Sequence, residues 1–284
     1  MQKYCSIQID LDDNQCIQPR QRNLPYDPAM SDAFLQGIKN MERFLMPYPI
    51  ALFVVGLDMT VEAKVHRIRE LLKRKPDIEI ANHSYSHFNN FNSLTHYEKE
   101  KEILDADAII KTALDIERIY GFRSPGYIFN NEIIEILKAN AYTYDASLLP
   151  SYFGPVLRSL NYFINKVPGK DNFGHIKNGF MPNEPTPLDK ERKFFEINVS
   201  VCPVLRIPIN YSIIRSKSLY SAIAPFIKKI QCLNFIFHLD DFVNIDTEKL
   251  RHVLKLITIE RNIILPRDIC NLLRKSERPL CRTF

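Results

Sequence analysis

Residues 78–87 read Ile78-Glu79-Ile80-Ala81-Asn82-His83-Ser84-Tyr85-Ser86-His87, a short apolar run that leads into a pair of histidines. The apolar run is typical of a buried strand. If a helical turn begins at the histidines, positions i and i+4 lie on one face, and both imidazoles can bind one metal ion. A solvated or helix-capping pair is the ordinary alternative. The stretch predicts a strand whose carboxyl end carries two metal ligands.

A second strand-like run near the start of the chain also ends in possible ligands. It reads Ile7-Gln8-Ile9-Asp10-Leu11-Asp12-Asp13. Side chains alternate along a strand, so Asp10 and Asp12 share one face and Asp13 points to the other side. The aspartates alone could also belong to a turn. Because ligands collect at the carboxyl ends of strands in α/β folds, the two runs together predict a site of two histidines and one carboxylate.

Strand-like runs alternate with helical patterns along the chain. The expected strands cover 4–11, 50–55, 78–81, 119–122, 141–147, 194–201 and 233–238, and the expected helices cover 61–75, 95–120, 131–140, 216–230, 246–260 and 266–275. This alternation predicts a parallel sheet with helical cover. About seven strands suit a closed or nearly closed barrel, and a doubly wound open sheet is the alternative. We expect one domain over residues 1–284, with an irregular insertion at the rim over 151–192.

Composition narrows the classes of protein. The chain is 45% hydrophobic and 25% charged with a net charge of +5, and no Lys/Arg cluster alternates with aromatics, so nucleic-acid binding is not expected. The longest apolar stretch, 50–57, is too short to span a bilayer. No secretory signal is recognised, so we expect a cytoplasmic protein with reduced thiols at its scattered cysteines: Cys5, Cys16, Cys202, Cys232, Cys270 and Cys281.

Three further segments end expected strands. They are Arg123-Ser124-Pro125-Gly126-Tyr127, Tyr144-Asp145-Ala146-Ser147 and Phe235-Ile236-Phe237-His238. With the aspartates and the histidine pair they form five motifs whose order resembles the polysaccharide deacetylase family, also called carbohydrate esterase family 4. The resemblance runs from about residue 4 to residue 275. It implies a distorted (β/α) barrel with a catalytic metal.

The resemblance also implies a role for each motif. His83, His87 and Asp12 would bind a divalent metal, most simply Zn²⁺, although Co²⁺, Ni²⁺ or Fe²⁺ suits the same ligands. Asp10 would be the general base and His238 the general acid. Arg123 would pair with the general base, and Asp145 would orient the acidic histidine. The backbone N–H of Tyr127 would stabilise the oxyanion. Substrate binding is expected from Tyr127, Pro125 and Ser147.

Two departures from the family pattern leave alternatives open. The usual first motif has adjacent aspartates followed by Gly, whereas this chain has Asp-Leu-Asp-Asp-Asn at 10–14. Asp10/Asp12 and Asp12/Asp13 are therefore both possible base and ligand pairs, with Asp13 as the alternative ligand. A large aromatic often follows the proline of the third motif, but Gly126 stands here, which either widens the pocket or shifts the oxyanion donor by one residue.

The expected activity is metal-dependent removal of an acetyl group from an N-acetylated sugar. This sugar would be a precursor in the synthesis of a surface glycan. One alternative is an amidohydrolase that acts on a ureide or cyclic amide with the same metal site. Another is a non-catalytic glycan-binding barrel. The first motif also resembles haloacid-dehalogenase-like phosphatases, but that family would want Thr or Val at Asn14 and gives the histidine pair no role. The oligomeric state stays open.

Overall fold

The computed structural model describes residues 2–21, 24, 32–165 and 172–276, so Cys281, the two ends of the expected domain and residues 166–171 of the insertion lie outside it. Seven parallel strands form the central sheet in the order β8-β1-β2-β3-β4-β5-β7. Their bounds are β1 (Lys3–Asp10), β2 (Ile50–Val54), β3 (Ile78–Asn82), β4 (Gly121–Phe122), β5 (Tyr144–Asp145), β7 (Phe195–Glu196) and β8 (Cys232–His238).

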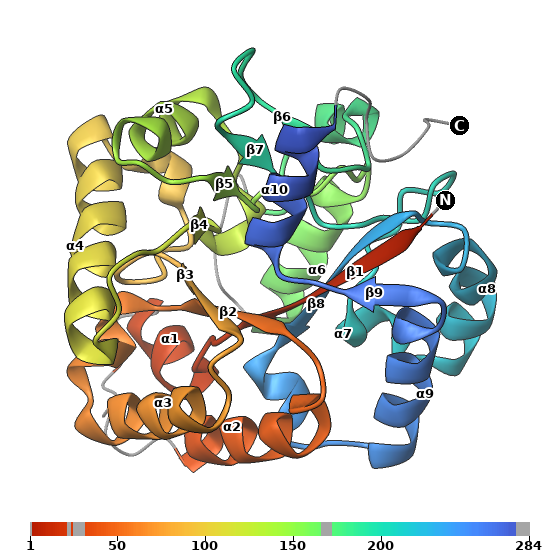
Figure 1. The fold of residues 1–284 in the computed structure, drawn as a ribbon, viewed down its shortest axis with the longest axis horizontal. Coiled ribbons are helices and arrows are strands. Elements are labelled where there is room, and N and C mark those ends of the chain that lie inside the picture. Colours follow the sequence, from red (N-terminus) through yellow and green to blue (C-terminus); the bar gives the residue numbers. More distant parts are fainter. Residues whose placement is uncertain (1, 22–23, 25–31, 166–171, 277–284) are drawn as a thin grey trace.

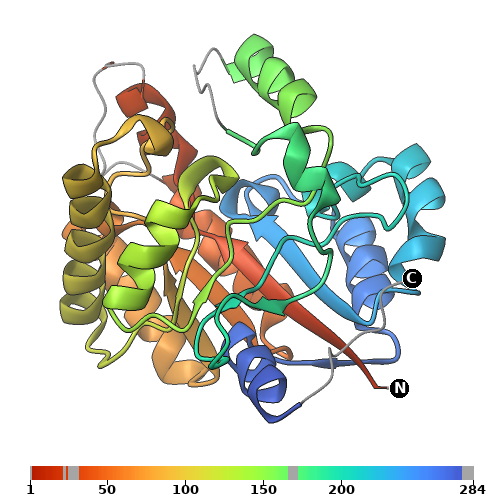
Figure 2. The same cartoon turned by 90° about the horizontal axis from the view of Figure 1, so that it is seen from above.

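Two short strands extend this sheet. β6 (Thr186–Pro187) pairs antiparallel with β7, and β9 (Arg261–Ile263) pairs in parallel with the first residues of β1. The sheet curls (Figures 1 and 2), and segment 198–200 approaches β8 across its open side. There the side-chain amide of Asn234 donates to the carbonyl of Asn198 at 2.9 Å, and its backbone N–H donates to Ser200 Oγ at 2.9 Å. The predicted distorted barrel of about seven strands is confirmed.

Helices cover the outer face of the curled sheet (Figure 1). Most sit between consecutive strands: α2 (Asp32–Leu45), α3 (Glu62–Arg74), α4 (His96–Leu114), α5 (Asn131–Ala139), α7 (Tyr211–Ile214), α8 (Lys217–Ile227) and α9 (Thr247–Thr258). The last helix, α10 (Pro266–Lys275), packs its buried residues Ile269 and Leu273 in one cluster with Phe53, Ala81 and other inward-facing strand residues. It therefore closes the end of the barrel where the strands begin (Figure 2). None of the helices within the described residues has the length and apolar character needed to cross a membrane.

Several element boundaries differ from the sequence expectations. Thr95 and Glu98 form a capping box at the start of α4, but the helix, expected to reach residue 120, ends at Leu114 because Asp115 adopts a left-handed conformation with φ 55°. The insertion is not wholly irregular, since it contains α6 (Gly154–Asn165). Helix α1 (Asn14–Gln21) and α2 had no expected counterpart. Strands β4 and β5 are only two residues long, because the chain leaves the sheet soon after entering it.

Candidate metal centre and active site

Asp12, His83 and His87 meet at the carboxyl ends of β1 and β3. Their ligand atoms all lie within 4.8 Å of one another, and Asp12 Oδ1 is 3.3 Å from His83 Nε2 and 3.4 Å from His87 Nε2. All three residues are buried, and Asp12 Oδ1 makes no hydrogen bond with the residues that the structure describes. A buried oxygen without a hydrogen bond, facing two imidazoles, fits a divalent cation held by one carboxylate and two histidines.

The histidine pair is held by a loop, so the expected helical turn is wrong. Ser84 and His87 both have positive φ, at 63° and 53°. Local side chains hold this shape: Ser84 N–H donates to Asn82 Oδ1 at 2.8 Å, and His87 N–H donates to Ser84 Oγ at 3.1 Å. Short polar side chains compete with helical hydrogen bonds in this way. The two rings nevertheless meet, with centroids 4.9 Å apart.

A backbone carbonyl from the third motif orients His83. His83 Nδ1 lies 2.7 Å from the carbonyl oxygen of Arg123, so this nitrogen carries the proton and donates it. The Nε2 lone pair is therefore left facing Asp12. Burial alone would raise the pKa of Asp12, but the positive charge of His87 and His83, when these rings are protonated, outweighs it and holds this pKa well below its usual range. The carboxylate is consequently ionised, as a metal ligand must be.

Asp13 points away from this cluster. Its carboxylate pairs with the ammonium of Lys64 at 2.5 Å, and Lys64 also reaches Asp58 at 2.8 Å. Lys64 is almost fully buried and lies over the ring of Phe34, 4.9 Å from its centroid. Between the two aspartates left open by the sequence, the structure brings Asp12, not Asp13, to the histidines.

Arg123 lies fully buried beneath the site. It donates hydrogen bonds to the side chains of Asp10 and Gln8, and its Nε donates to the carbonyl of Ala146 at 3.0 Å. Its guanidinium lies over the ring of Phe53, 3.9 Å from the centroid. The expected pairing of Arg123 with Asp10 is thus present in the geometry. Because Arg123 holds one oxygen of Asp10, the carboxylate has a fixed orientation.

His238 ends β8 beside Asp10. Its Nε2 is 3.8 Å from Asp10 Oδ2 and 3.4 Å from the hydroxyl of Tyr127. Its backbone N–H donates to Asp241 Oδ2 at 2.9 Å. The carboxylate near the imidazole is therefore Asp10, and the orienting contact expected from Asp145 is not among the interactions of the described residues.

Asp145 has other partners. Ser147 donates its hydroxyl to Asp145 Oδ1 at 2.6 Å, and Glu196 lies opposite Asp145 in the β5–β7 register. Burial raises the pKa of Asp145 to about 7 and that of Glu196 well above its usual range. Two buried carboxyl groups side by side share a proton more easily than both ionise. The sequence missed Glu196, because a glutamate inside an apolar run carries no motif.

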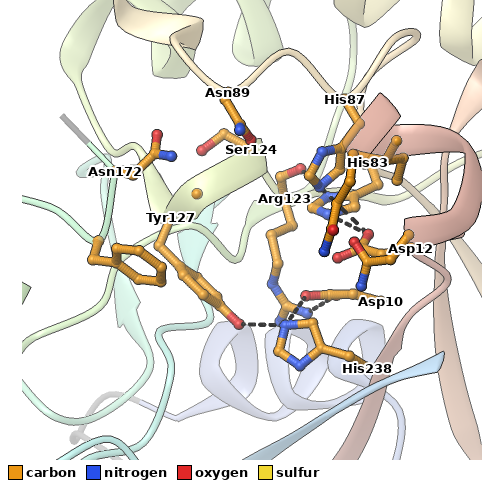
Figure 3. Close-up of a pocket in the computed structure, with 15 residues that line it drawn as sticks. Asp10, Asp12, His83, His87, Asn89, Arg123, Ser124, Tyr127, Asn172 and His238 are labelled. Carbon is orange, nitrogen blue, oxygen red and sulfur yellow. Dashed lines mark hydrogen bonds and ion pairs between the residues drawn. The ribbon is translucent and has the colours of Figure 1, made fainter. Parts of the chain in front are cut away.

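Ser147, Pro125 and the backbone N–H of Tyr127 do not face the cavity, although the resemblance implied substrate contacts for them. Ser147 Oγ accepts the backbone N–H of Ser124 at 2.8 Å, so Ser147 braces the loop, and neither it nor Pro125 lines the cavity. The backbone N–H of Tyr127 donates to the carbonyl of Ser124 at 3.3 Å and is not directed at a substrate position. Tyr127 contributes its side chain to the cavity instead (Figure 3).

These groups line one cavity of about 180 Å³ (Figure 3). Asp10, Asp12, His83, His87 and His238 lie together on one side of it. Residues to which the sequence assigned no role in the site complete the wall: Asn14, Ile17, Gln18, Asn89, Asn172 and Phe173. They follow no motif spacing, and chain folding alone brings them to the cavity.

One family model matches part of the chain. Residues 44–144 match the sequence model of the polysaccharide deacetylase family, a range that includes His83, His87 and Arg123. The resemblance to this family is therefore confirmed over that part of the chain. No curated protein sequence matches the chain.

Solved structures share the fold over nearly the whole chain. A candidate polysaccharide deacetylase from Mycobacterium smegmatis is 15% identical with a TM-score of 0.65, covering 99% of this chain and 95% of that one. A second candidate, from Pseudomonas aeruginosa PAO1, is 11% identical with a TM-score of 0.63, covering 96% and 91%. Puue allantoinase is 11% identical with a TM-score of 0.62 and the same coverage. At these identities the likeness shows the fold alone.

Proposed function

We propose that this chain is a metal-dependent hydrolase that removes the acetyl group from an N-acetylated sugar. The observation that carries the proposal is the convergence of three groups on one cavity. These are the Asp12–His83–His87 cluster, the Asp10–Arg123 pair and His238. The match of residues 44–144 to the polysaccharide deacetylases supports the reaction class.

The chain's own residues have distinct tasks in this proposal. Asp12, His83 and His87 would hold a divalent cation, which when bound supplies Lewis-acid chemistry and acidifies water. Asp10 accepts a proton from the attacking water, and the guanidinium of Arg123 holds Asp10 in a fixed orientation. His238 Nε2 delivers a proton to the leaving amine. Asp10 Oδ2 lies 3.8 Å from His238 Nε2, so the proton that Asp10 takes from water can pass to His238 and restore the one given to the amine.

The volume of the cavity and the state of the cysteines bear on the substrate and on the cellular location. A volume of about 180 Å³ is below the range typical of pockets that enclose a drug-sized ligand, so the site would hold the acetamido group with the sugar next to it. We propose a single-sugar or end-unit precursor of a surface glycan as the substrate. All five cysteines within the described residues are buried free thiols, which supports a reducing, cytoplasmic location.

A second candidate function uses the same groups on a ureide or cyclic amide. The likeness to Puue allantoinase supports this second candidate, because that protein shares the fold over nearly the whole chain. Both substrates contain a C–N bond that hydrolysis can cleave. The two functions differ in the product, which is acetate in one case and a ring-opened ureide in the other.

Product analysis on a substrate panel tests the proposal. N-acetylhexosamines, free and nucleotide-linked, should release acetate, and a chelator should abolish the release until Zn²⁺ is restored. His83→Ala should be inactive, whereas His252→Ala, at an exposed position on α9, should retain full activity as a matched control. Turnover of a ureide without acetate release would transfer the assignment to the second candidate. Sugar binding without turnover at any metal would indicate a binding barrel.

A further inference from the structure

The wall of the cavity opposite the histidines is built by two segments that fit each other. Gly126 has φ 67°, and a Cβ on it would lie 2.6 Å from Asn172 Oδ1, so only glycine leaves room for Asn172. Phe173 N–H donates to the carbonyl of Gly126 at 2.5 Å. From the other side, Arg158 on α6 donates to the carbonyls of Asn172 and Gly174, at 3.1 and 2.9 Å. Asn172 thus occupies the space that Gly126 leaves open.

One oxygen of Asn172 has no hydrogen-bond partner among the described residues. The residue is 3% exposed, and its Oδ1 is buried without a hydrogen bond to any described residue. Figure 3 shows its amide directed into the cavity, toward Ser124 and Asn89. A buried polar group without a partner costs on the order of 1–3 kcal/mol, so such groups in folded proteins are retained where a ligand or water completes them.

An aromatic surface lies beside this amide. Phe173 lines the cavity next to Tyr127, with ring centroids 6.3 Å apart and the planes tilted by 38°. The side-chain amide of asparagine offers two donors and one acceptor. A sugar presents the same mixture, because each ring hydroxyl both donates and accepts and its C–H face is apolar. An apolar amine would leave the amide of Asn172 unpaired.

We propose that Asn172 and Phe173 form a sugar subsite, in which the Asn172 amide hydrogen-bonds to ring hydroxyl groups adjacent to the acetamido group. This assignment rests on the proposed deacetylase function and names the residue that selects the sugar. Gly126 supports the subsite by leaving room for Asn172. The insertion, which carries none of the five motifs, thereby sets specificity.

Paired substrates isolate this role from a structural one. For wild type, kcat/KM should be higher for N-acetylhexosamine than for N-acetylcyclohexylamine, which has the same amide and no ring hydroxyls. Asn172→Leu should lower kcat/KM about 10- to 100-fold for the sugar and less than about threefold for the cyclohexyl amide. Asn262→Leu, exposed on β9 at the far end of the barrel, should change neither. An equal loss on both substrates, or no loss on the sugar, overturns the proposal.

Two further measurements keep the test decisive if Asn172→Leu folds poorly. Asn172→Ser removes the amide with less added apolar volume, and Gly126→Ala displaces Asn172 by the clash described above. Both should lose discrimination between the two substrates while zinc content is retained. Binding of N-acetylhexosamine to zinc-loaded His238→Ala, measured by calorimetry, requires no turnover. If sugar binding depends on Asn172 but the wild type releases no acetate, the deacetylase proposal alone is refuted. If the wild type releases acetate and all variants discriminate between the substrates as it does, the subsite alone is refuted.

Discussion

Replacing Arg123 by methionine should destabilise the fold strongly because it strands a buried charge. Arg123 is 0% exposed and its guanidinium donates to Asp10, Gln8 and Ala146. Removing one partner of a buried ion pair costs about 3–5 kcal/mol. At about 1.4 kcal/mol per factor of ten, the unfolded fraction should rise roughly 100- to 4,000-fold. Most of this loss should come from Asp10, which stays buried at 2% exposure without its cation.

A double-mutant cycle tests this reasoning. Urea unfolding in the presence of chelator would be followed by circular dichroism for wild type, Arg123→Met, Asp10→Asn and the double variant. In the Asp10→Asn background, Arg123→Met should cost about 2 kcal/mol less than in wild type, because no buried carboxylate is left unpaired. Arg67→Met, which breaks a part-exposed pair with Glu42, should cost about 1 kcal/mol or less. Equal costs for Arg123→Met in both backgrounds would refute the ion-pair explanation.

Three other outcomes are expected. His83→Ala should lose bound metal and activity together. His238→Ala should retain its metal, measured by elemental analysis, and lose about 10²-fold or more in turnover. Unchanged metal content in His83→Ala would contradict the assignment of His83 as a ligand. Burial raises the pKa of Glu79 from 4.5 to about 7, so between these pH values the folded state keeps a proton that the unfolded chain releases. The contribution of Glu79 to the free energy of unfolding, roughly 3 kcal/mol, is therefore present below pH 4.5 and lost as the pH rises to 7. Glu79→Gln should flatten that part of the stability profile, and an unaltered slope would show that Glu79 ionises normally. Gly121→Ala would place a Cβ 1.9 Å from the ring of Tyr144 and should cost about 1–3 kcal/mol by thermal unfolding, whereas a smaller loss would mean that the ring moves aside.

The succession of strands and helices along the chain could be predicted largely from local pattern. The alternation of apolar runs and helical periods predicted the parallel barrel, and six expected helices correspond to α3, α4, α5, α8, α9 and α10. Helix α1 was missed because it has almost no apolar periodicity and contains Pro19. Boundaries set by a single backbone conformation, such as the left-handed Asp115, have no strong sequence signal when the residue is not glycine.

The sequence by itself determined which residues could share a face. β1 ends at Asp10, but the expected alternation holds beyond it, because Asp10 and Asp12 both line the cavity whereas Asp13 pairs with Lys64. Motif order placed Arg123 and His238 at strand ends. These properties follow from covalent geometry and nearest neighbours, so they can be read without knowing the packing.

Only the tertiary structure decided which distant groups touch. Asp10 meets an arginine 113 positions away, Asp145 faces Glu196 instead of His238, and Asn172 fills the space above Gly126. The histidine pair converges through a loop with positive φ, although the same spacing suits a helix. Such contacts depend on sheet register and on how an insertion packs back on the rim. These are collective properties of the folded chain, because the free energy that selects them comes from burial across many elements at once.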